Sequence, residues 1–467
     1  MRSRAPSLAV PAPSVRPLAL LWQLALALGL LLLLALPLRA AEPATAGTVP
    51  QEFTLENGLQ VVVIEDRRAP VVTHMLWYRV GAADEPPGQS GIAHYLEHLM
   101  FKATDNMEEG EFSAVVEANG GRDNAFTSWD YTGYFQRVAA DRLDLMMQME
   151  ADRMANLRID LSDWLPERAV ILEERGQVLE SRPERVFSEQ MRAALFQNHP
   201  YGIPIIGWRH EMETLDDVAA KEFYRAHYAP NNAILIVAGD VDTDAVRALA
   251  EEHYGPIPAN PDIGPVARPM EPPHFAERRL IMRDGRVAQP FLNRVYLAPV
   301  RRAGDQAEAA AFQMLAALLG GSAQTSVLER ALTHDRGIAL SAWAGFNGNA
   351  RDHGTFSLGV TPRPGTSLDE AEAALDEVLT EFIETGVDAE QFERVQMQIR
   401  AAAIYELDDA GARARTIGAD LSVGLTLDDS LGWLETLLDV TPEQVIAAAQ
   451  ALDRNASVTG WLMGEEG

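Results

Sequence analysis

A proline-rich segment near the middle of the chain most constrains how this sequence can fold. Residues 254–273 read YGPIPANPDIGPVARPMEPP, with neither helical nor strand periodicity, as is typical of a linker. The segment divides the chain into two halves of similar size. We therefore predict an N-terminal domain over residues 50–255, a linker over 256–273 and a C-terminal domain over 274–465.

The two halves share one order of predicted elements. Each opens with strand-like segments, continues into helices and closes on an apolar run typical of a buried strand. The matching segments are 59–65 with 279–282, 71–80 with 291–299, and 232–239 with 457–463. Because strands and helices come in runs rather than in strict alternation, the sequence predicts a duplicated α+β unit.

The N-terminus has the pattern of an export segment. Arg2, Arg4 and Arg16 precede an apolar run from Leu18 to Leu36. We predict that residues 1–40 are a cleaved signal peptide or, because the run approaches the roughly 20 residues that span a bilayer, an uncleaved anchor. The rest of the chain is then expected in the periplasm or cell envelope of a Gram-negative bacterium, with membrane contact only through this segment.

The composition excludes several classes of chemistry. The chain has no cysteine, so it can form neither disulfides nor thiolate zinc sites and has no cysteine nucleophile. Its 39 Lys and Arg against 68 Asp and Glu give a net charge of -29, which argues against nucleic-acid binding.

The stretch GIAHYLEHLMF is predicted to form a helix that Ser90 caps. His94 and His98 are four residues apart, so both imidazoles project from one face and can bind one zinc ion, with Glu97 beside them. Glu97 has the chemistry of a general base for a water molecule at such an ion. The alternative is a helix with two surface histidines.

A catalytic zinc site needs a third protein ligand. Residues 163–180 are predicted to form a helix that begins at a capping Asp163. Glu167 and Glu174 share one of its faces, whereas Glu173 is turned about 100° from Glu174. Spacing alone does not choose between Glu173 and Glu174, and a solvated acidic helix is the alternative.

Several stretches taken together resemble a known family. HYLEH, the glutamate 76 residues after its last histidine, NAFTSWDYTGY, HPYGIPIIGW and PNNAILIVAGDVD are similar to the pitrilysin family, and most to its mitochondrial-processing-peptidase-type branch. The resemblance covers nearly everything after residue 50. It implies two similar α+β domains, each a mostly antiparallel sheet packed with helices.

The resemblance also implies roles for individual residues. His94, His98 and Glu174 would hold one Zn²⁺, Glu97 would act as general base, and Glu167 would orient a histidine of the site. Asn124, Ala125 and Phe126 match an exposed strand edge to which a substrate peptide adds as an extra strand.

The second half has no counterpart of HYLEH, so one zinc ion per chain is expected. The corresponding helix, residues 305–319, carries apolar residues at core spacing, namely Phe312, Leu315, Leu318 and Leu319. Relatives that act alone also carry, in this half, an Arg and seven residues later a Tyr that hold the substrate. Here those positions are Thr333 and Leu340, which predicts a heterodimer with a same-fold partner that supplies the pair.

The function predicted is that of an exported zinc endopeptidase that cleaves peptides or unfolded proteins, as the catalytic subunit of a heterodimer. The alternative is a non-catalytic family member that acts as an assembly or core subunit, or as a peptide-holding protein.

Overall fold

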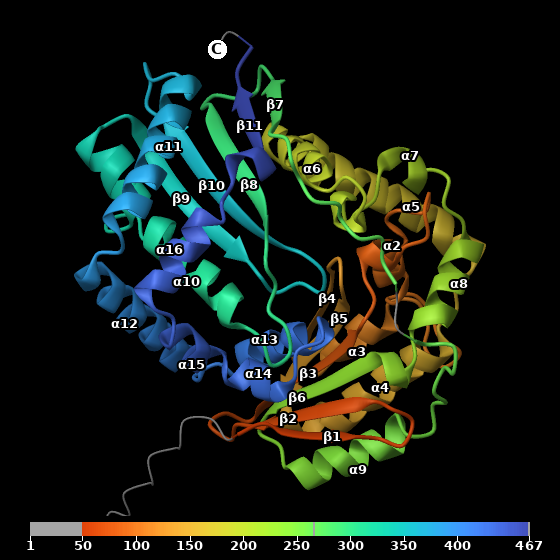
Figure 1. Ribbon diagram of the computed structural model, residues 1–467. Coiled ribbons are helices and arrows are strands. Elements are labelled where there is room, and N and C mark those ends of the chain that lie inside the picture. Colours follow the sequence, from red (N-terminus) through yellow and green to blue (C-terminus); the bar gives the residue numbers. More distant parts are fainter. Residues whose placement is uncertain (1–48, 265–266, 466–467) are drawn as a thin grey trace, which may run out of the picture. The chain divides into compact units, whose positions relative to one another are not determined.

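The computed structural model describes residues 49–264 and 267–465, where the strands form two sheets, one from each half (Figure 1). In hydrogen-bonding order, the first sheet contains β1 (Gln51–Thr54), β2 (Gln60–Glu65), β6 (Ala233–Gly239), β3 (Val71–Tyr78), β5 (Thr132–Ala139) and β4 (Arg122–Thr127). The second contains β7 (Arg278–Arg283), β11 (Ser457–Met463), β8 (Phe291–Ala298), β10 (Gly354–Pro362) and β9 (Ala339–Asn347). The predicted signal or anchor, residues 1–40, lies outside the described residues.

The two sheets have the same topology apart from the additional edge strand β1. In each, the last strand of the half lies between two early strands: β6 runs parallel to β2 and antiparallel to β3, and β11 runs parallel to β7 and antiparallel to β8. Strands β4 and β9 form corresponding edges. The predicted fold, two similar and mostly antiparallel α+β units, is confirmed.

Helices surround both sheets. Those of the first half are α2 (Ile92–Leu99), α3 (Glu111–Ala118), α4 (Leu143–Asn156), α5 (Leu161–Arg175), α6 (Pro183–Leu195), α7 (Arg209–Met212), α8 (Asp217–His227) and α9 (Thr243–His253). Those of the second half are α10 (Ala307–Gly320), α11 (Leu368–Thr385), α12 (Ala389–Glu406), α13 (Ala410–Ser422), α14 (Leu427–Leu431), α15 (Trp433–Leu438) and α16 (Pro442–Gln450). None of the helices in the described part of the chain is long and apolar enough to cross a membrane.

One helix of each half packs on the sheet of the other half. Helix α13 packs on β3 and β6, and α6 packs on β11. Glycines permit both approaches: a Cβ on Gly418 would lie 2.2 Å from the indole of Trp77, and one on Gly460 would lie 2.2 Å from the sulfur of Met191. The two halves therefore share two of their hydrophobic clusters.

An arginine in the linker region ties the halves together. Arg268 forms ion pairs with Asp84 and Asp130 of the first half and with Asp352 of the second, at 2.8, 2.5 and 2.7 Å. Its side chain is only 3% exposed. Because a buried charge is stable only when it is paired, this single guanidinium links three carboxylates from distant parts of the chain and offsets part of their charge.

We expect Arg268→Ala to lower the free energy of unfolding by about 3–5 kcal/mol, because it leaves buried carboxylates without a counter-charge. Urea unfolding followed by circular dichroism measures the change. Arg286→Ala is the matched control, because Arg286 is 51% exposed and pairs with Asp284, and it should cost less than about 1 kcal/mol. Equal losses in both variants would contradict the role given to Arg268.

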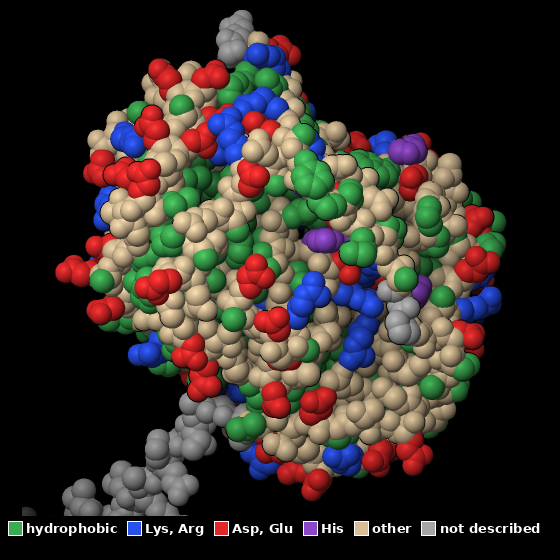
Figure 2. All heavy atoms as spheres, in the orientation of Figure 1, with side chains coloured by type: hydrophobic (Ala, Val, Ile, Leu, Met, Phe, Trp, Pro, Cys, Tyr) green, Lys and Arg blue, Asp and Glu red, His purple; other side chains and the backbone are tan. Residues whose placement is uncertain are grey.

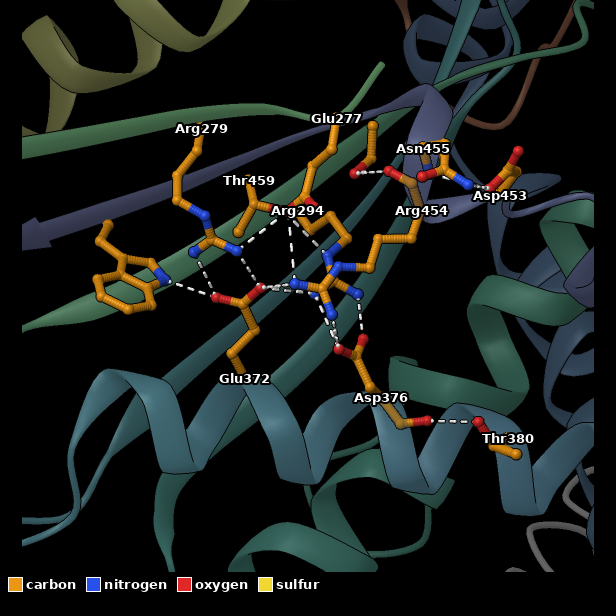
Figure 3. A network of polar contacts seen from close by, with 12 residues as sticks. Glu277, Arg279, Arg294, Glu372, Asp376, Thr380, Asp453, Arg454, Asn455 and Thr459 are labelled. Carbon is orange, nitrogen blue, oxygen red and sulfur yellow. Dashed lines mark hydrogen bonds and ion pairs between the residues drawn. The ribbon is translucent and has the colours of Figure 1, made fainter. Parts of the chain in front are cut away.

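A second ionic network fastens α11 to the second sheet (Figure 3). Glu372 accepts hydrogen bonds from Arg279 of β7, Arg294 of β8 and Arg454, and from the indole of Trp461. The arginines are balanced by Glu372 together with Glu277 and Asp376, so the network compensates its own charge. Elsewhere on the molecule, acidic side chains are spread over the face drawn in Figure 2 rather than gathered into one patch.

Candidate active site

The N-terminus of the helix that carries the His-x-x-Glu-His motif is capped by a residue other than the one predicted. Helix α2 begins at Ile92 after Gly91, and the carboxylate of Glu85 accepts hydrogen bonds from the backbone N–H groups of Gly91 and Ala93, both at 2.9 Å. The prediction that Ser90 caps the helix was wrong, because its hydroxyl accepts a hydrogen bond from the backbone N–H of Trp208 instead. Gly91 has a φ of 91°, which glycine adopts without strain.

His94, His98 and Glu174 come together between α2 and α5. One potential ligand atom from each lies within 4.8 Å of the others. Oε2 of Glu174 is 3.8 Å from Nε2 of His94 and 3.5 Å from Nε2 of His98. This carboxylate oxygen is buried and accepts no hydrogen bond from the residues that the structure describes. Three donor atoms that converge in this way, two imidazole nitrogens and one carboxylate oxygen, fit a zinc ion.

The structure also separates the two adjacent glutamates. Glu174 turns toward the histidines, whereas the exposed carboxylate of Glu173 accepts a hydrogen bond from Gln177 one turn further along the chain. The start of the supporting helix differs from the prediction: α5 begins at Leu161, after Asp160, so Asp163 lies within its first turn rather than at its cap. Pro166 is the sixth residue of α5 and lies beyond its first turn, so it cannot donate the backbone hydrogen bond that the carbonyl of Ser162 would otherwise accept.

Glu167, about two helical turns before Glu174 on α5, contacts His98 on the side away from the cluster. Its Oε1 lies 2.8 Å from Nδ1 of His98, and its Oε2 lies 2.9 Å from Nζ of Lys102. The hydrogen bond with His98, followed by that with Lys102, lowers the pKa of Glu167 to about 2 despite partial burial. A carboxylate held at Nδ1 fixes the ring of His98 and leaves Nε2 facing the cluster.

The two histidines have opposite pKa shifts. Burial, and then the neighbouring His98, lower the pKa of His94 to about 4, so His94 is neutral near pH 7. Burial also opposes a charge on His98, but the carboxylates of Glu167 and Glu174 outweigh it and raise its pKa to about 9. A cation bound at this site would therefore displace a proton from His98.

Glu97 lies on α2 beside the cluster. Its Oε2 accepts a hydrogen bond of 2.5 Å from the hydroxyl of Thr127, at the end of β4. Burial raises the pKa of Glu97, although the Thr127 hydroxyl opposes the shift. A carboxylate with a raised pKa is better suited to accept a proton near neutral pH.

A cavity of about 600 Å³ opens in front of these residues. His94, Glu97 and Glu174 line one part of it, and Phe126 and Thr127 bring β4 to its wall. Asn124 and Ala125 lie further along β4, which among the described strands pairs only with β5 and so leaves one edge unpaired. The backbone N–H of Ala125 is bonded only locally, to the side chain of Asn124. The ring of Phe126 also packs against Trp77, at 4.8 Å between centroids.

The second half has no counterpart of this cluster among the described residues. Helix α10 occupies the corresponding place after β8, and its Phe312, Leu315, Leu318 and Leu319 are buried. Thr333 is buried in the helical segment before β9, whereas Leu340 on β9 is 48% exposed.

Three supporting residues escaped the sequence analysis: Glu85, Lys102 and Thr127. Lys102 lies four residues after His98, and this helical spacing was a signal for a basic group close to the site. Thr127 lies within the NAFTSWDYTGY stretch, but nothing in its sequence position indicates a bond to Glu97. Glu85 acts through a loop contact that has no local pattern.

Comparison with known proteins agrees with this arrangement. The sequence model described as "Insulinase (Peptidase family M16)" matches residues 60–208, and that described as "Peptidase M16 inactive domain" matches residues 214–399. An uncharacterized zinc protease of Streptomyces coelicolor is 30% identical over 421 residues, which cover 88% of this chain and 89% of the relative. A probable mitochondrial-processing peptidase subunit beta of Arabidopsis thaliana is 25% identical over 379 residues, 79% of this chain and 69% of the relative.

The fold has a close counterpart among solved structures. A protease from Helicobacter pylori superimposes with a TM-score of 0.82 at 26% identity, covering 88% of this chain and 99% of the other. The match therefore spans both sheets and the segment between them. This chain belongs to peptidase family M16, the insulinase and pitrilysin family.

Proposed function

We propose that this chain is a zinc endopeptidase that cleaves peptides or unfolded proteins. The observation that carries the proposal is the convergence of two imidazole nitrogens and an unpartnered carboxylate oxygen beside Glu97, in a cavity that a free strand edge borders. His94, His98 and Glu174 would hold one zinc ion, which lowers the pKa of a water molecule and polarises a carbonyl group.

The remaining residues have separate roles in the proposal. Glu97 accepts the proton of the attacking water and can pass it to the leaving amine, which its raised pKa favours. Thr127 positions this carboxylate. Glu167 orients His98 and is thus a positioning residue, since it does not face the cavity.

We further propose that the substrate lies along β4. A peptide that adds as a strand would bond to outward-facing backbone groups such as the N–H of Ala125, with Asn124 and Phe126 beside it. Binding through the main chain tolerates many sequences. This placement leads the peptide from the strand edge to Thr127 and Glu97 at the cavity wall.

A metal-removal assay with an internally quenched peptide tests the proposal. Cleavage should stop after treatment with a chelator and return when zinc is added in stoichiometric amount. Peptide retention without cleavage, in a chain shown to hold zinc and assayed with its same-fold partner, would favour the alternative of a non-catalytic or peptide-holding family member.

Glu167→Gln should weaken zinc binding by about 10–100-fold, because loss of a carboxylate behind a ligating histidine removes its orientation. Competition with a fluorescent zinc chelator measures the affinity. Glu109→Gln is the matched control, because Glu109 also pairs with Lys102 but does not touch His98. Equal affinities in the two variants would remove the role assigned to Glu167.

We also propose that the active enzyme is a heterodimer and that this chain is its catalytic subunit. Thr333 and Leu340 can supply neither a guanidinium nor a phenol hydroxyl to the substrate. One of the relatives is itself named as a subunit. The N-terminal pattern of residues 1–40 further suggests that the chain acts in the periplasm or cell envelope.

If the active enzyme is a heterodimer, the single chain alone should have low peptidase activity. A same-fold partner that carries the Arg and Tyr should raise kcat/KM by about 100-fold or more, because a substrate held on both sides is better positioned for attack. Co-expression with a family relative encoded nearby, followed by assay of each chain and of the pair, measures the effect. Full activity of the single chain, shown to be free of a partner, would contradict this proposal.

A further inference from the structure

The cavity continues beyond the cluster into a region with a different character. Its walls there are apolar and its charged groups come from α6. The apolar lining consists of Trp129, Val178, Leu179, Ile205 and Ile206. The charged side chains of α6 that line it are Arg185, Glu189 and Arg192.

Among these charged side chains of α6, the carboxylate of Glu189 is already neutralised by an arginine. Both oxygens of Glu189 accept hydrogen bonds from Nη2 of Arg175, at 3.1 and 2.9 Å. Nη1 of Arg175 donates a hydrogen bond to the backbone oxygen of Gly207, which holds the Arg175–Glu189 pair in place. Apart from Glu97 and Glu174 in the proposed metal site, the cavity lining therefore offers no free carboxylate.

Arg192 has no anionic partner within the described part of the chain. Its guanidinium lies 3.9 Å from the ring centroid of Trp129 and donates one long hydrogen bond, 3.4 Å, to the backbone oxygen of Tyr201. Burial lowers its pKa to about 10, opposed only by Tyr201. A guanidinium has five N–H donors, and a desolvated charge without a counter-ion is costly. An anion that enters the cavity would therefore form a favourable ion pair with Arg192.

Arg185 adds a second positive charge. It lies seven residues before Arg192, about two turns along the same face of α6, and its side chain is exposed. It forms no ion pair with any carboxylate among residues 49–264 and 267–465. An anion that approaches Arg192 therefore meets a basic rim despite the acidic net charge of the whole chain.

We propose, building on the peptidase function above, that Arg192 forms a specificity subsite that binds a carboxylate of the peptide substrate. The carboxylate belongs to an Asp or Glu side chain or to the peptide's C-terminus. The planar guanidinium, supported from one side by Trp129, can donate two parallel hydrogen bonds to such a group. The apolar walls receive the methylene groups that precede the carboxylate.

The subsite is tested by binding, independently of turnover. Fluorescently labelled peptides that differ only by Glu or Gln at one position, each with a free or an amidated C-terminus, are titrated against zinc-loaded Glu97→Gln chain. Fluorescence anisotropy should show about tenfold tighter binding of peptides that carry the recognised carboxylate, as expected for a charge-assisted hydrogen bond. The Glu/Gln and free/amidated pairs identify which carboxylate is bound.

Arg192→Gln, in the same background, should abolish the preference, and Arg192→Lys should retain part of it because lysine keeps the charge but not the fork. Arg182→Gln is the matched control, because Arg182 precedes α6 outside the cavity lining, and it should keep the full preference. A preference that survives Arg192→Gln, or equal binding of all peptides by the parent, would overturn the proposal. Carboxylate-dependent binding by the unmodified chain, without cleavage even when its same-fold partner is present, would instead count against the peptidase function.

Discussion

Replacement of Glu97 by glutamine is expected to lower kcat by about 10³-fold while the zinc content of the chain stays unchanged. Glutamine has nearly the same shape and can still bond to Thr127, but its amide cannot accept the proton of the attacking water. His94, His98 and Glu174 are untouched, so metal binding should be preserved. Turnover of a quenched peptide and elemental analysis of the purified variant give the two quantities.

The matched control for this variant is Glu173→Gln. Glu173 is exposed, accepts a hydrogen bond from Gln177 and lies outside the cavity lining. Because surface substitutions usually have small effects, the same chemical change there should alter kcat by less than about twofold. Unchanged turnover in Glu97→Gln would end the assignment of Glu97 as the base. A loss of zinc together with activity would mean that Glu97 supports the metal site instead.

His98→Ala is expected to abolish both zinc binding and turnover. The substitution removes one of three proposed ligands and leaves Glu167 without its partner on this side. Loss of an outer hydrogen-bonding partner alone costs about 10–100-fold in metal affinity, so loss of a ligand should exceed 100-fold. Zinc competition and the peptide assay measure the two effects.

His210→Ala provides the comparison, because the side chain of His210 is 79% exposed and does not line the cavity. It should bind zinc and turn over peptide as the unmodified chain does. Stoichiometric zinc that remains in His98→Ala would show that the ion is held elsewhere. Lost activity in His210→Ala would show that the assay responds to general instability.

The sheets could be predicted from the sequence because their central strands are locally distinctive. The run that became β6 is apolar at nearly every position, as expected of a strand covered on both faces. The run that became β11 is also buried along most of its length, although it includes Ser457, Thr459 and Gly460. The exchange of α6 and α13 between the halves could not be predicted. A helical pattern shows that a face is buried but does not identify the sheet that buries it.

The candidate site, too, could be predicted from the sequence only in part. His94, Glu97 and His98 lie on one helix, so their spacing determines their common face. The choice of Glu174 over Glu173 depends on how α5 packs against α2, and spacing left it open. The loop contact of Glu85 with Gly91 before α2, and the contact of Arg268 with Asp352 between distant segments, exist only in the folded chain and have no sequence period.

Zinc-edge anomalous diffraction from crystals of the zinc-loaded chain would locate the metal ion. We expect a single anomalous peak per chain, in contact with Nε2 of His94, Nε2 of His98 and the carboxylate of Glu174. We also expect the peak to be absent from crystals of His98→Ala grown under the same conditions. A peak bound by other residues, or none at this cluster in chains that cleave peptide, would contradict the proposed zinc site.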